Sequence, residues 1–203
     1  MPRVCKLVML FVVIGLLAEP AVAGSKKKKS TTQADTLKPP RGFVTMHVAG
    51  VMESKGGKAV VLKEEKNGYL LPIWIGEAEA FAIQLRLSRR SFQRPLTHDL
   101  LDKVVQKLGG ELIKIHVDDL QDNTFLGTVF IRQNKKIISI DARPSDSIAL
   151  AVGNKIPIFV SQKVLDRAGI KEDQLKEKPG KDKPNPDNLL KDILDSDREE
   201  HTL

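Results

Sequence analysis

The stretch "KKIISIDARPSDSIALAVG", Lys135 to Gly153, changes its hydrophobic period about half-way along. As far as Ala142, apolar and polar residues alternate, which is the pattern of a half-buried strand. Pro144 then opens an apolar run with helical spacing. Proline suits the first position of a helix because its missing N–H would have no partner there. The stretch therefore predicts a strand that turns directly into a helix.

Similar changes of period run through about residues 42–170. They predict strands over 43–52, 58–65, 69–75, 112–120, 124–133, 135–142 and 157–160, and helices over 77–90, 97–110, 144–153 and 162–169. Hairpin turns are expected at Asn67-Gly68 and at Gln133-Asn134. The sequence thus indicates a single mixed α/β (α+β) domain, with a mixed sheet of about seven strands and three to four helices.

Apolar spacing also assigns an inward face to two of these helices. In helix 77–90 the inward residues are expected to be Ala78, Phe81, Ala82 and Leu85. In helix 97–110 they are expected to be Leu100, Leu101, Val104, Val105 and Leu108. Gly109-Gly110 provides the stop of the second helix, because glycine readily takes the left-handed conformation that ends a helix.

Residues 1–23 have the pattern of a signal peptide. A basic start precedes an apolar run from Leu7 to Ala18, which at about 1.5 Å per residue falls short of the roughly 30 Å core of a bilayer. Cleavage after Ala23 would give an exported protein, periplasmic or secreted, with no permanent membrane span and without Cys5, the one cysteine. Lys26–Lys29 oppose export, so an uncleaved anchor is the alternative.

Charge is spread unevenly along the chain, whose net charge is +7. Residues 24–41 carry a net charge of +5 and are expected to form a flexible basic linker. Residues 42–170 carry +4, and the tail from 171 to 203 carries −3 and is expected to be mostly disordered. The basic excess suits an anionic partner such as nucleic acid, but +4 is also an ordinary surface charge for a domain of this size.

Polar residues gather where predicted strands end and helices begin. Glu77 and Glu79 follow one strand, and Ser145 and Asp146 follow another. Two Arg-Pro pairs, in "RPLTHD" (Arg94–Asp99) and "RPSD" (Arg143–Asp146), lead directly into helices. Helix starts favour anions, because their free N–H groups and the helix dipole point outward. Each residue alone also has a structural explanation: Thr97 can cap its helix, and Asp141 can pair with Arg143.

Three motifs taken together resemble one known family. "IWIGEAEAFAI", "RPLTHDLL" and "IDARPSDSIALAV…IPIFV" occur in an order and spacing similar to those of the bifunctional nuclease domain, over about residues 43–165. The chain departs from the family pattern at Ser147, where alanine is expected, and in "LSRRSFQRP", which lacks the usual small residues. The resemblance implies an α/β domain that self-associates, as a dimer or trimer, and degrades RNA and DNA without strong sequence preference. It does not supply a mechanism.

A mechanism can be proposed from the residue types. Phosphodiester hydrolysis needs an activated water, charge stabilisation on the phosphate and a proton for the leaving oxygen. His98 is the candidate general acid or base, because imidazole ordinarily titrates near neutral pH, and Asp99 is the candidate to orient it. Arg143 is a candidate catalytic residue that holds phosphate oxygens. The other candidate substrate-binding residues are Arg94 and Ser145.

Clustered carboxylates suggest a divalent metal. Glu77, Glu79 and Asp146 are the candidate ligands for Mg²⁺ or Mn²⁺, which prefer oxygen donors, and Asp146 is also a candidate catalytic residue. The remaining histidines of the predicted domain, His47 and His116, lie on the polar faces of their strands and are expected at the surface.

A different class of function is compatible with the same residues. A non-catalytic oligomeric module could use these helix starts and arginines to bind an anionic ligand or partner. An aromatic content of 4% leaves few side chains for stacking bases, which argues against a dedicated binder of single strands. Cleavage that stops with a chelator would distinguish a metal-assisted nuclease from this binding module.

Overall fold

The computed structural model describes residues 38–54 and 56–174. The predicted signal peptide, most of the predicted linker and nearly all of the predicted tail lie outside these residues. The described elements are β1 (Phe43–Ser54), β2 (Gly57–Lys63), β3 (Tyr69–Ile75), α2 (Glu77–Leu87), α3 (Thr97–Lys107), β4 (Gly110–Gln121), β5 (Thr124–Gln133), β6 (Lys136–Ala142), α4 (Pro144–Asn154), β7 (Ile158–Ser161), α5 (Gln162–Ala168) and β8 (Ile170–Lys171). Within the described residues, no helix is both long and apolar enough to cross a membrane.

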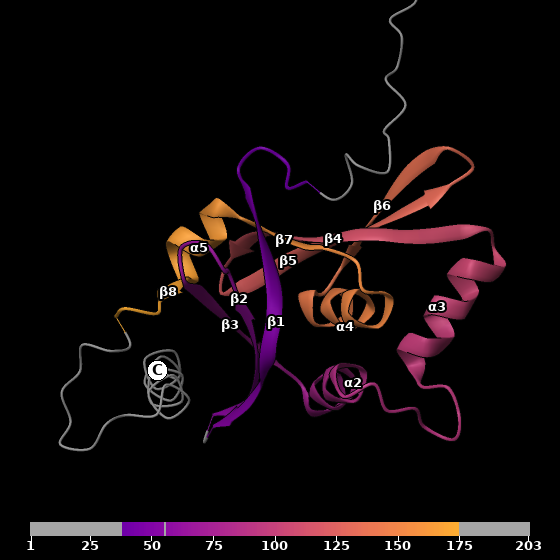
Figure 1. The fold of residues 1–203 in the computed structure, drawn as a ribbon, viewed down its shortest axis with the longest axis horizontal. Helices are drawn as coiled ribbons and strands as arrows, with labels where there is room; N and C mark the ends of the chain where they lie inside the picture. Colours follow the sequence, from indigo (N-terminus) through magenta and orange to yellow (C-terminus); the bar gives the residue numbers. More distant parts are fainter. Residues whose placement is uncertain (1–37, 55, 175–203) are drawn as a thin grey trace, which may run out of the picture. The chain divides into compact units, whose positions relative to one another are not determined.

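The eight described strands form one mixed sheet in the order β6-β5-β4-β7-β1-β2-β3-β8 (Figure 1). The pair β4–β7 is parallel and the other neighbouring pairs are antiparallel. The predicted mixed α/β fold is confirmed. The sequence missed only β8, a strand of two residues that is too short to show a hydrophobic period.

The turns differ slightly from those predicted. The β5–β6 turn lies at Asn134-Lys135, one residue later than expected, and both residues have positive φ. The β2–β3 connection is longer than a two-residue turn. β2 ends at Lys63, and in the connection to Tyr69 only Gly68 has positive φ. The predicted stop of the second helix is confirmed, because α3 ends at Lys107 and Gly109 has φ +75°.

Helices α2 and α4 pack against each other and against the sheet, and Ile83 and Ile148 enter the main core cluster with the inward residues of the central strands (Figure 1). The inward face predicted for α2 is largely wrong. Its buried residues are Ala80, Ala82 and Ile83, whereas Ala78 and Phe81 are exposed. The helix is rotated because α4 covers it from one side, a contact that the spacing within one helix does not reveal.

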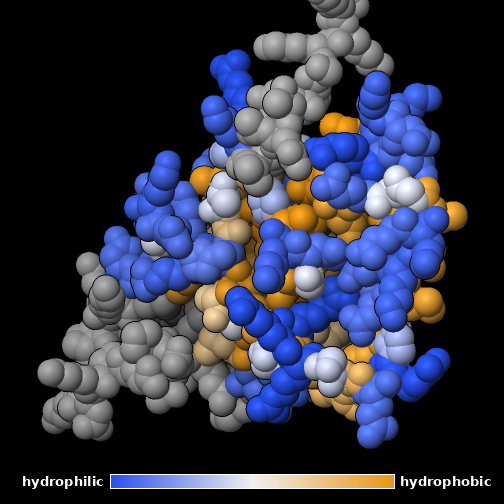
Figure 2. All heavy atoms as spheres, turned by 45° about the vertical axis from the view of Figure 1, so that its right-hand side comes forward, coloured by the Kyte–Doolittle hydropathy of each residue, from blue (hydrophilic) through white to orange (hydrophobic). Residues whose placement is uncertain are grey.

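Helix α3 turns its apolar face outward. Leu100, Leu101, Val104 and Leu108 are exposed, and Val105 is the one predicted inward residue that packs against the core. Figure 2, in which the right-hand side of Figure 1 comes forward, shows hydrophobic side chains that interrupt the hydrophilic surface. The prediction for this helix is therefore wrong. Its inward face carries His98 and Asp102 instead, because polar partners on α2 and α4 hold that side of the helix.

Candidate active site

Four predicted polar residues, from α2, from α3 and from the start of α4, form one chain of contacts. His98 Nε2, on α3, lies 3.1 Å from Asp146 Oδ1, on α4. Arg143, which precedes α4, donates from Nε to Asp146 Oδ2 at 2.8 Å and from Nη2 to Glu79 Oε1, on α2, at 2.7 Å. His98 is 9% exposed, whereas the Arg143 side chain is 67% exposed. A buried imidazole and an open guanidinium thus share one carboxylate.

Local sequence explains how α2 and α4 present these groups. Gly76 is the N-cap of α2, and a Cβ at this position would collide with the Glu79 carboxylate, so glycine leaves room for that side chain. Pro144 is the first residue of α4 and fixes the turn after Arg143. Ser147, which departs from the family pattern, is fully buried and donates from Oγ to the Arg143 carbonyl at 3.1 Å. Its hydroxyl ties this turn to the helix.

The electrostatics of the chain keep Asp146 charged. Partial burial raises the pKa of Asp146, but hydrogen bonds from Arg143 and His98 and their charges lower it further, so that its pKa lies below the ordinary value. The pKa of Arg143 is raised by its hydrogen bonds to Asp146 and Glu79. The carboxylate therefore remains an acceptor for the His98 N–H at neutral pH.

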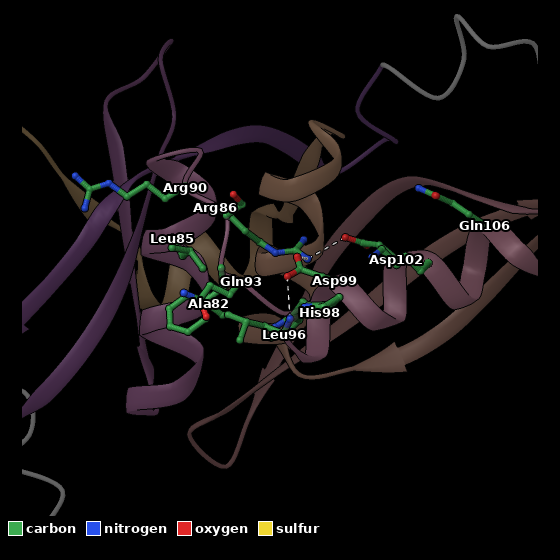
Figure 3. Close-up of a pocket in the computed structure, with 14 residues that line it drawn as sticks. Ala82, Leu85, Arg86, Arg90, Gln93, Leu96, His98, Asp99, Asp102 and Gln106 are labelled. Atoms are coloured by element: carbon green, nitrogen blue, oxygen red, sulfur yellow. Dashed lines mark hydrogen bonds and ion pairs between the residues drawn. The ribbon is translucent and has the colours of Figure 1, made fainter.

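A second polar network holds α3 in place. The Arg86 side chain, on α2, is nearly buried, and its Nη2 donates to Asp99 Oδ1 at 2.8 Å and to Asp102 Oδ2 at 2.9 Å (Figure 3). Its Nη1 donates to the Ala149 carbonyl of α4 at 3.0 Å. Asn154 donates to Asp102 Oδ1 at 2.8 Å. The network joins α2, α3 and α4, and it sets the position of the helix that carries His98.

A cavity of about 520 Å³ lies between the end of α2, the connection to α3, and α3 itself (Figure 3). His98 and Leu96 line it beside Arg86 and Asp99, and Arg90 and Lys103 contribute further basic groups. His98 therefore lines this cavity and also contacts Asp146, which does not line it. This is where a substrate can approach the imidazole.

The structure changes the roles predicted around Thr97 and Asp99. Leu96, not Thr97, is the N-cap of α3, and Thr97 makes no capping hydrogen bond, so the capping prediction is wrong. Asp99 Oδ2 accepts from the Leu96 N–H at 3.0 Å, and its other oxygen accepts from Arg86. Asp99 was expected to orient His98, but the carboxylate that contacts His98 is that of Asp146.

The three predicted metal ligands do not meet. Glu77 pairs with Lys58 of β2 at 3.0 Å, whereas Glu79 and Asp146 both bind the Arg143 guanidinium. Within residues 38–54 and 56–174, no three His, Cys, Asp or Glu side chains are grouped to hold an ion. Carboxylates already neutralised by lysine and arginine do not fit a Mg²⁺ or Mn²⁺ site as predicted. Metal dependence itself stays a prediction.

The remaining predicted site residues take no part in the contacts that join His98, Asp146, Arg143 and Glu79. Arg94 is exposed in the connection before α3, and Ser145 is buried in the first turn of α4. Their predicted roles in substrate binding stay predictions. Asp141 is exposed, and Arg143 pairs with Asp146 and Glu79 rather than with Asp141.

One of the two histidines predicted at the surface is buried. His47 is exposed, as expected. His116 is 6% exposed, because Phe43, Phe130 and Phe159 pack around its ring. These phenylalanines come from strands on both sides of β4, so the period of β4 alone could not reveal them.

Comparison with known proteins identifies the family of this chain. The sequence model of the bifunctional nuclease domain matches residues 60–173, which contain α2, α3, α4 and the whole chain of contacts. The chain belongs to the bifunctional nuclease domain family. The resemblance inferred from the three motifs is thereby confirmed.

Relatives with and without a named activity share this domain. An uncharacterized protein of Mycobacterium tuberculosis is 40% identical over 127 residues, which cover 62% of this chain and 76% of that protein. Bifunctional nuclease 1 of Arabidopsis thaliana is 31% identical over 108 residues, 51% of this chain and 33% of the plant protein. Bifunctional nuclease 2 of the same plant is 28% identical over 141 residues, 68% of this chain and 43% of its own length.

The site of this bifunctional nuclease domain contains residues that sequence reasoning missed. Arg86, Asp102 and Asn154 carry the network that positions α3. Each lies in a helix at a position that is ordinary for a surface charge or amide. Their partners lie on other helices, so no spacing within the sequence signals the network.

Proposed function

We propose that this protein is a nuclease that hydrolyses phosphodiester bonds of RNA and DNA with little sequence preference. Membership of the family supports the reaction class, and the names of the plant relatives support the activity. The observation that carries the proposal is the contact of His98 Nε2 with Asp146 Oδ1, with Arg143 bound to the other carboxylate oxygen.

This contact selects the tautomer of His98 that a general base needs. An ionised Asp146 accepts a proton from Nε2–H, so the neutral ring keeps its proton on Nε2 and leaves Nδ1 as the basic nitrogen. Among the described residues, the hydrogen bond of His98 is made through Nε2, so Nδ1 is the nitrogen that we propose as the base. His98 can then take a proton from the attacking water, and the imidazolium formed is stabilised by Asp146.

Arg143 supplies the charge that the phosphate requires. Its guanidinium is largely exposed and is held by Asp146 and Glu79, so its remaining N–H groups can contact phosphate oxygens. Arginine holds such oxygens in a fixed planar arrangement, and it stabilises the negative charge that grows on them in the transition state. In this proposal the general base, His98, and the phosphate-binding residue, Arg143, are both held by the Asp146 carboxylate.

A gel assay on purified protein tests the proposal. The protein is incubated with RNA and with DNA in Mg²⁺, in Mn²⁺ and in chelator. His98→Ala is expected to cut the rate by about 10²–10⁴, the usual contribution of a general acid or base. His47→Ala is the matched control. His47 is exposed on β1, and its ion pair is with Glu65 rather than with a residue of the candidate site. The chelator arm tests the predicted metal.

One result would reject the proposed nuclease activity, and another would reject the proposed role of His98 in it. One is binding of nucleic acid without cleavage in every metal, which would favour the anion-binding module. The other is a folded His98→Ala protein that cleaves at the parent rate, which would remove this histidine from the mechanism.

A further inference from the structure

Two exposed phenylalanines touch each other beside the site. Phe81 of α2 and Phe92 of the α2–α3 connection are 48% and 56% exposed, and their rings meet edge to face with centroids 6.0 Å apart. Among the described aromatic residues, only these two are exposed. Phenylalanine lacks a polar group that would favour solvent, so two adjacent exposed rings suggest a surface with an apolar ligand.

The same surface is basic. Phe92 lines the cavity that His98 also lines, together with Arg90 and Lys103. The acidic residues of the cavity, Asp99 and Asp102, are both paired with Arg86. Arg90 and Lys103 form no ion pair with any described residue. Together with Arg86 they outnumber the two carboxylates of the cavity, so its net charge is positive. An aromatic face next to unpaired cations fits a ligand that has both flat rings and negative charge.

We propose that Phe92, braced by Phe81, stacks against an unpaired base of a nucleic acid strand. This inference rests on the proposed function, because it places the phosphate of that strand at Arg143 and His98. Arg90 and Lys103 then contact neighbouring phosphates. A base inside a duplex is covered on both faces by its neighbours, whereas an unpaired base offers a face to an aromatic ring. The site therefore selects single-stranded RNA and DNA over duplexes.

Binding of two single-stranded probes, one with bases and one without, isolates the contribution of the base. One probe is a short labelled deoxythymidine oligomer, and the other is an abasic deoxyribose-phosphate oligomer with the same number of phosphates. Fluorescence anisotropy in the His98→Ala protein measures both without cleavage. Stacking contributes about 1–3 kcal/mol per base, so the thymidine oligomer is expected to bind roughly 5- to 150-fold more tightly.

Substitution of Phe92 tests whether its ring causes the difference in affinity between the two oligomers. Phe92→Ala is expected to abolish the difference between the two oligomers while leaving the affinity for the abasic one unchanged, and Phe92→Tyr is expected to retain the difference. Ile137→Ala is the matched control, because Ile137 is 43% exposed on β6 and does not line the cavity. In the otherwise parent protein, Phe92→Ala should reduce cleavage of single strands more than cleavage of duplexes.

Three outcomes would overturn the inference. The first is equal loss of affinity for both oligomers in Phe92→Ala, and the second is equal affinity of the parent protein for both. The third is a change in the oligomeric state of Phe92→Ala, measured as the mass of the assembly in solution. This result would assign the two rings to a contact between copies of the chain. The proposed function fails separately, through absence of cleavage by the parent protein, and base-dependent binding that Phe92→Ala abolishes would then still support the stacking site.

Discussion

Asp146 is the residue on which the charge of the site depends, because both His98 and Arg143 bind it. Asp146→Asn keeps the shape and removes the negative charge. It is expected to lower the free energy of unfolding at pH 6 by about 1–3 kcal/mol, the size of a hydrogen bond to a charged group. It should also reduce cleavage strongly, because an amide no longer fixes the tautomer of His98.

The sign of the pH dependence follows from the pKa of Asp146, which is lower in the folded protein than the ordinary value of about 3.9. A carboxyl with a depressed pKa stabilises the fold above the unfolded-state pKa, and this contribution disappears as the pH falls through the folded-state pKa. The stability difference between parent and Asp146→Asn should therefore be full near pH 6 and shrink below about pH 4. Urea unfolding across this range measures it, with Asp141→Asn as the control. A constant difference would contradict the charge argument.

Asp99, rather than Thr97, accepts the hydrogen bond that holds the start of α3. Thr97→Ala is expected to change the free energy of unfolding by less than about 0.5 kcal/mol, because Thr97 is a first-turn residue without a capping hydrogen bond. Asp99→Ala removes an acceptor for the Leu96 N–H and for Arg86, and should cost about 1–3 kcal/mol. Thermal unfolding of the two variants compares them, and a larger loss for Thr97→Ala would restore the capping interpretation.

At the scale of elements, the packing of α2 on α4 depends on Gly153. Replacement of a glycine within a helix by alanine normally raises the free energy of unfolding by about 0.5–1 kcal/mol. Here a Cβ at Gly153 would overlap the Arg86 guanidinium, which three partners hold in place. Gly153→Ala is therefore expected to destabilise the protein by about 1–3 kcal/mol and to reduce cleavage, since Arg86 must move and α3 moves with it.

Gly50→Ala provides the control for this prediction, because a Cβ at Gly50 meets no atom within 4 Å. The stabilities of both variants can be measured by urea unfolding. If Gly153→Ala is more stable than the parent, Arg86 adapts easily and the network does not set the position of α3.

At the scale of the whole molecule, the outward apolar face of α3 bears on self-association. Leu100, Leu101, Val104 and Leu108 are exposed on one helix, and faces of this kind commonly mark contacts between proteins. The predicted homo-oligomer, a dimer or trimer, would cover this face with a second copy of the chain. Val104→Asp is then expected to convert the oligomer to a monomer, because it buries a charge in the contact.

Light scattering after size exclusion gives the mass of each protein. Lys107→Asp is the control, because it changes the charge of the same helix at an exposed polar position. A parent protein that is monomeric at micromolar concentration contradicts the oligomer, and an oligomer that persists in Val104→Asp places the contact elsewhere.

Local patterns determined most of the secondary structure. Alternating residues in β4 and β5, Pro144 at the start of α4 and Gly109 after α3 each act on their own segment of backbone, so the sequence alone predicted these features. The motifs that contain His98, Arg143 and Asp146 also pointed to the family and to the residues of the site. The strand, helix-start and helix-end signals are readable because the interactions behind them join residues a few positions apart.

Tertiary structure alone decided which side of each helix faces inward and which residues meet. The outward apolar face of α3, the burial of His116 and the pairing of His98 with Asp146 rather than Asp99 all depend on groups from other elements. Arg86 reaches Asp102 across the α2–α3 connection, and Phe81 meets Phe92 only because that connection folds back. Hydrophobic period measures which residues share a face, but the partner that covers a face is supplied by distant parts of the chain. The physical reason is that burial and ion pairing depend on which residues lie close together in space, and these residues are often far apart in the sequence.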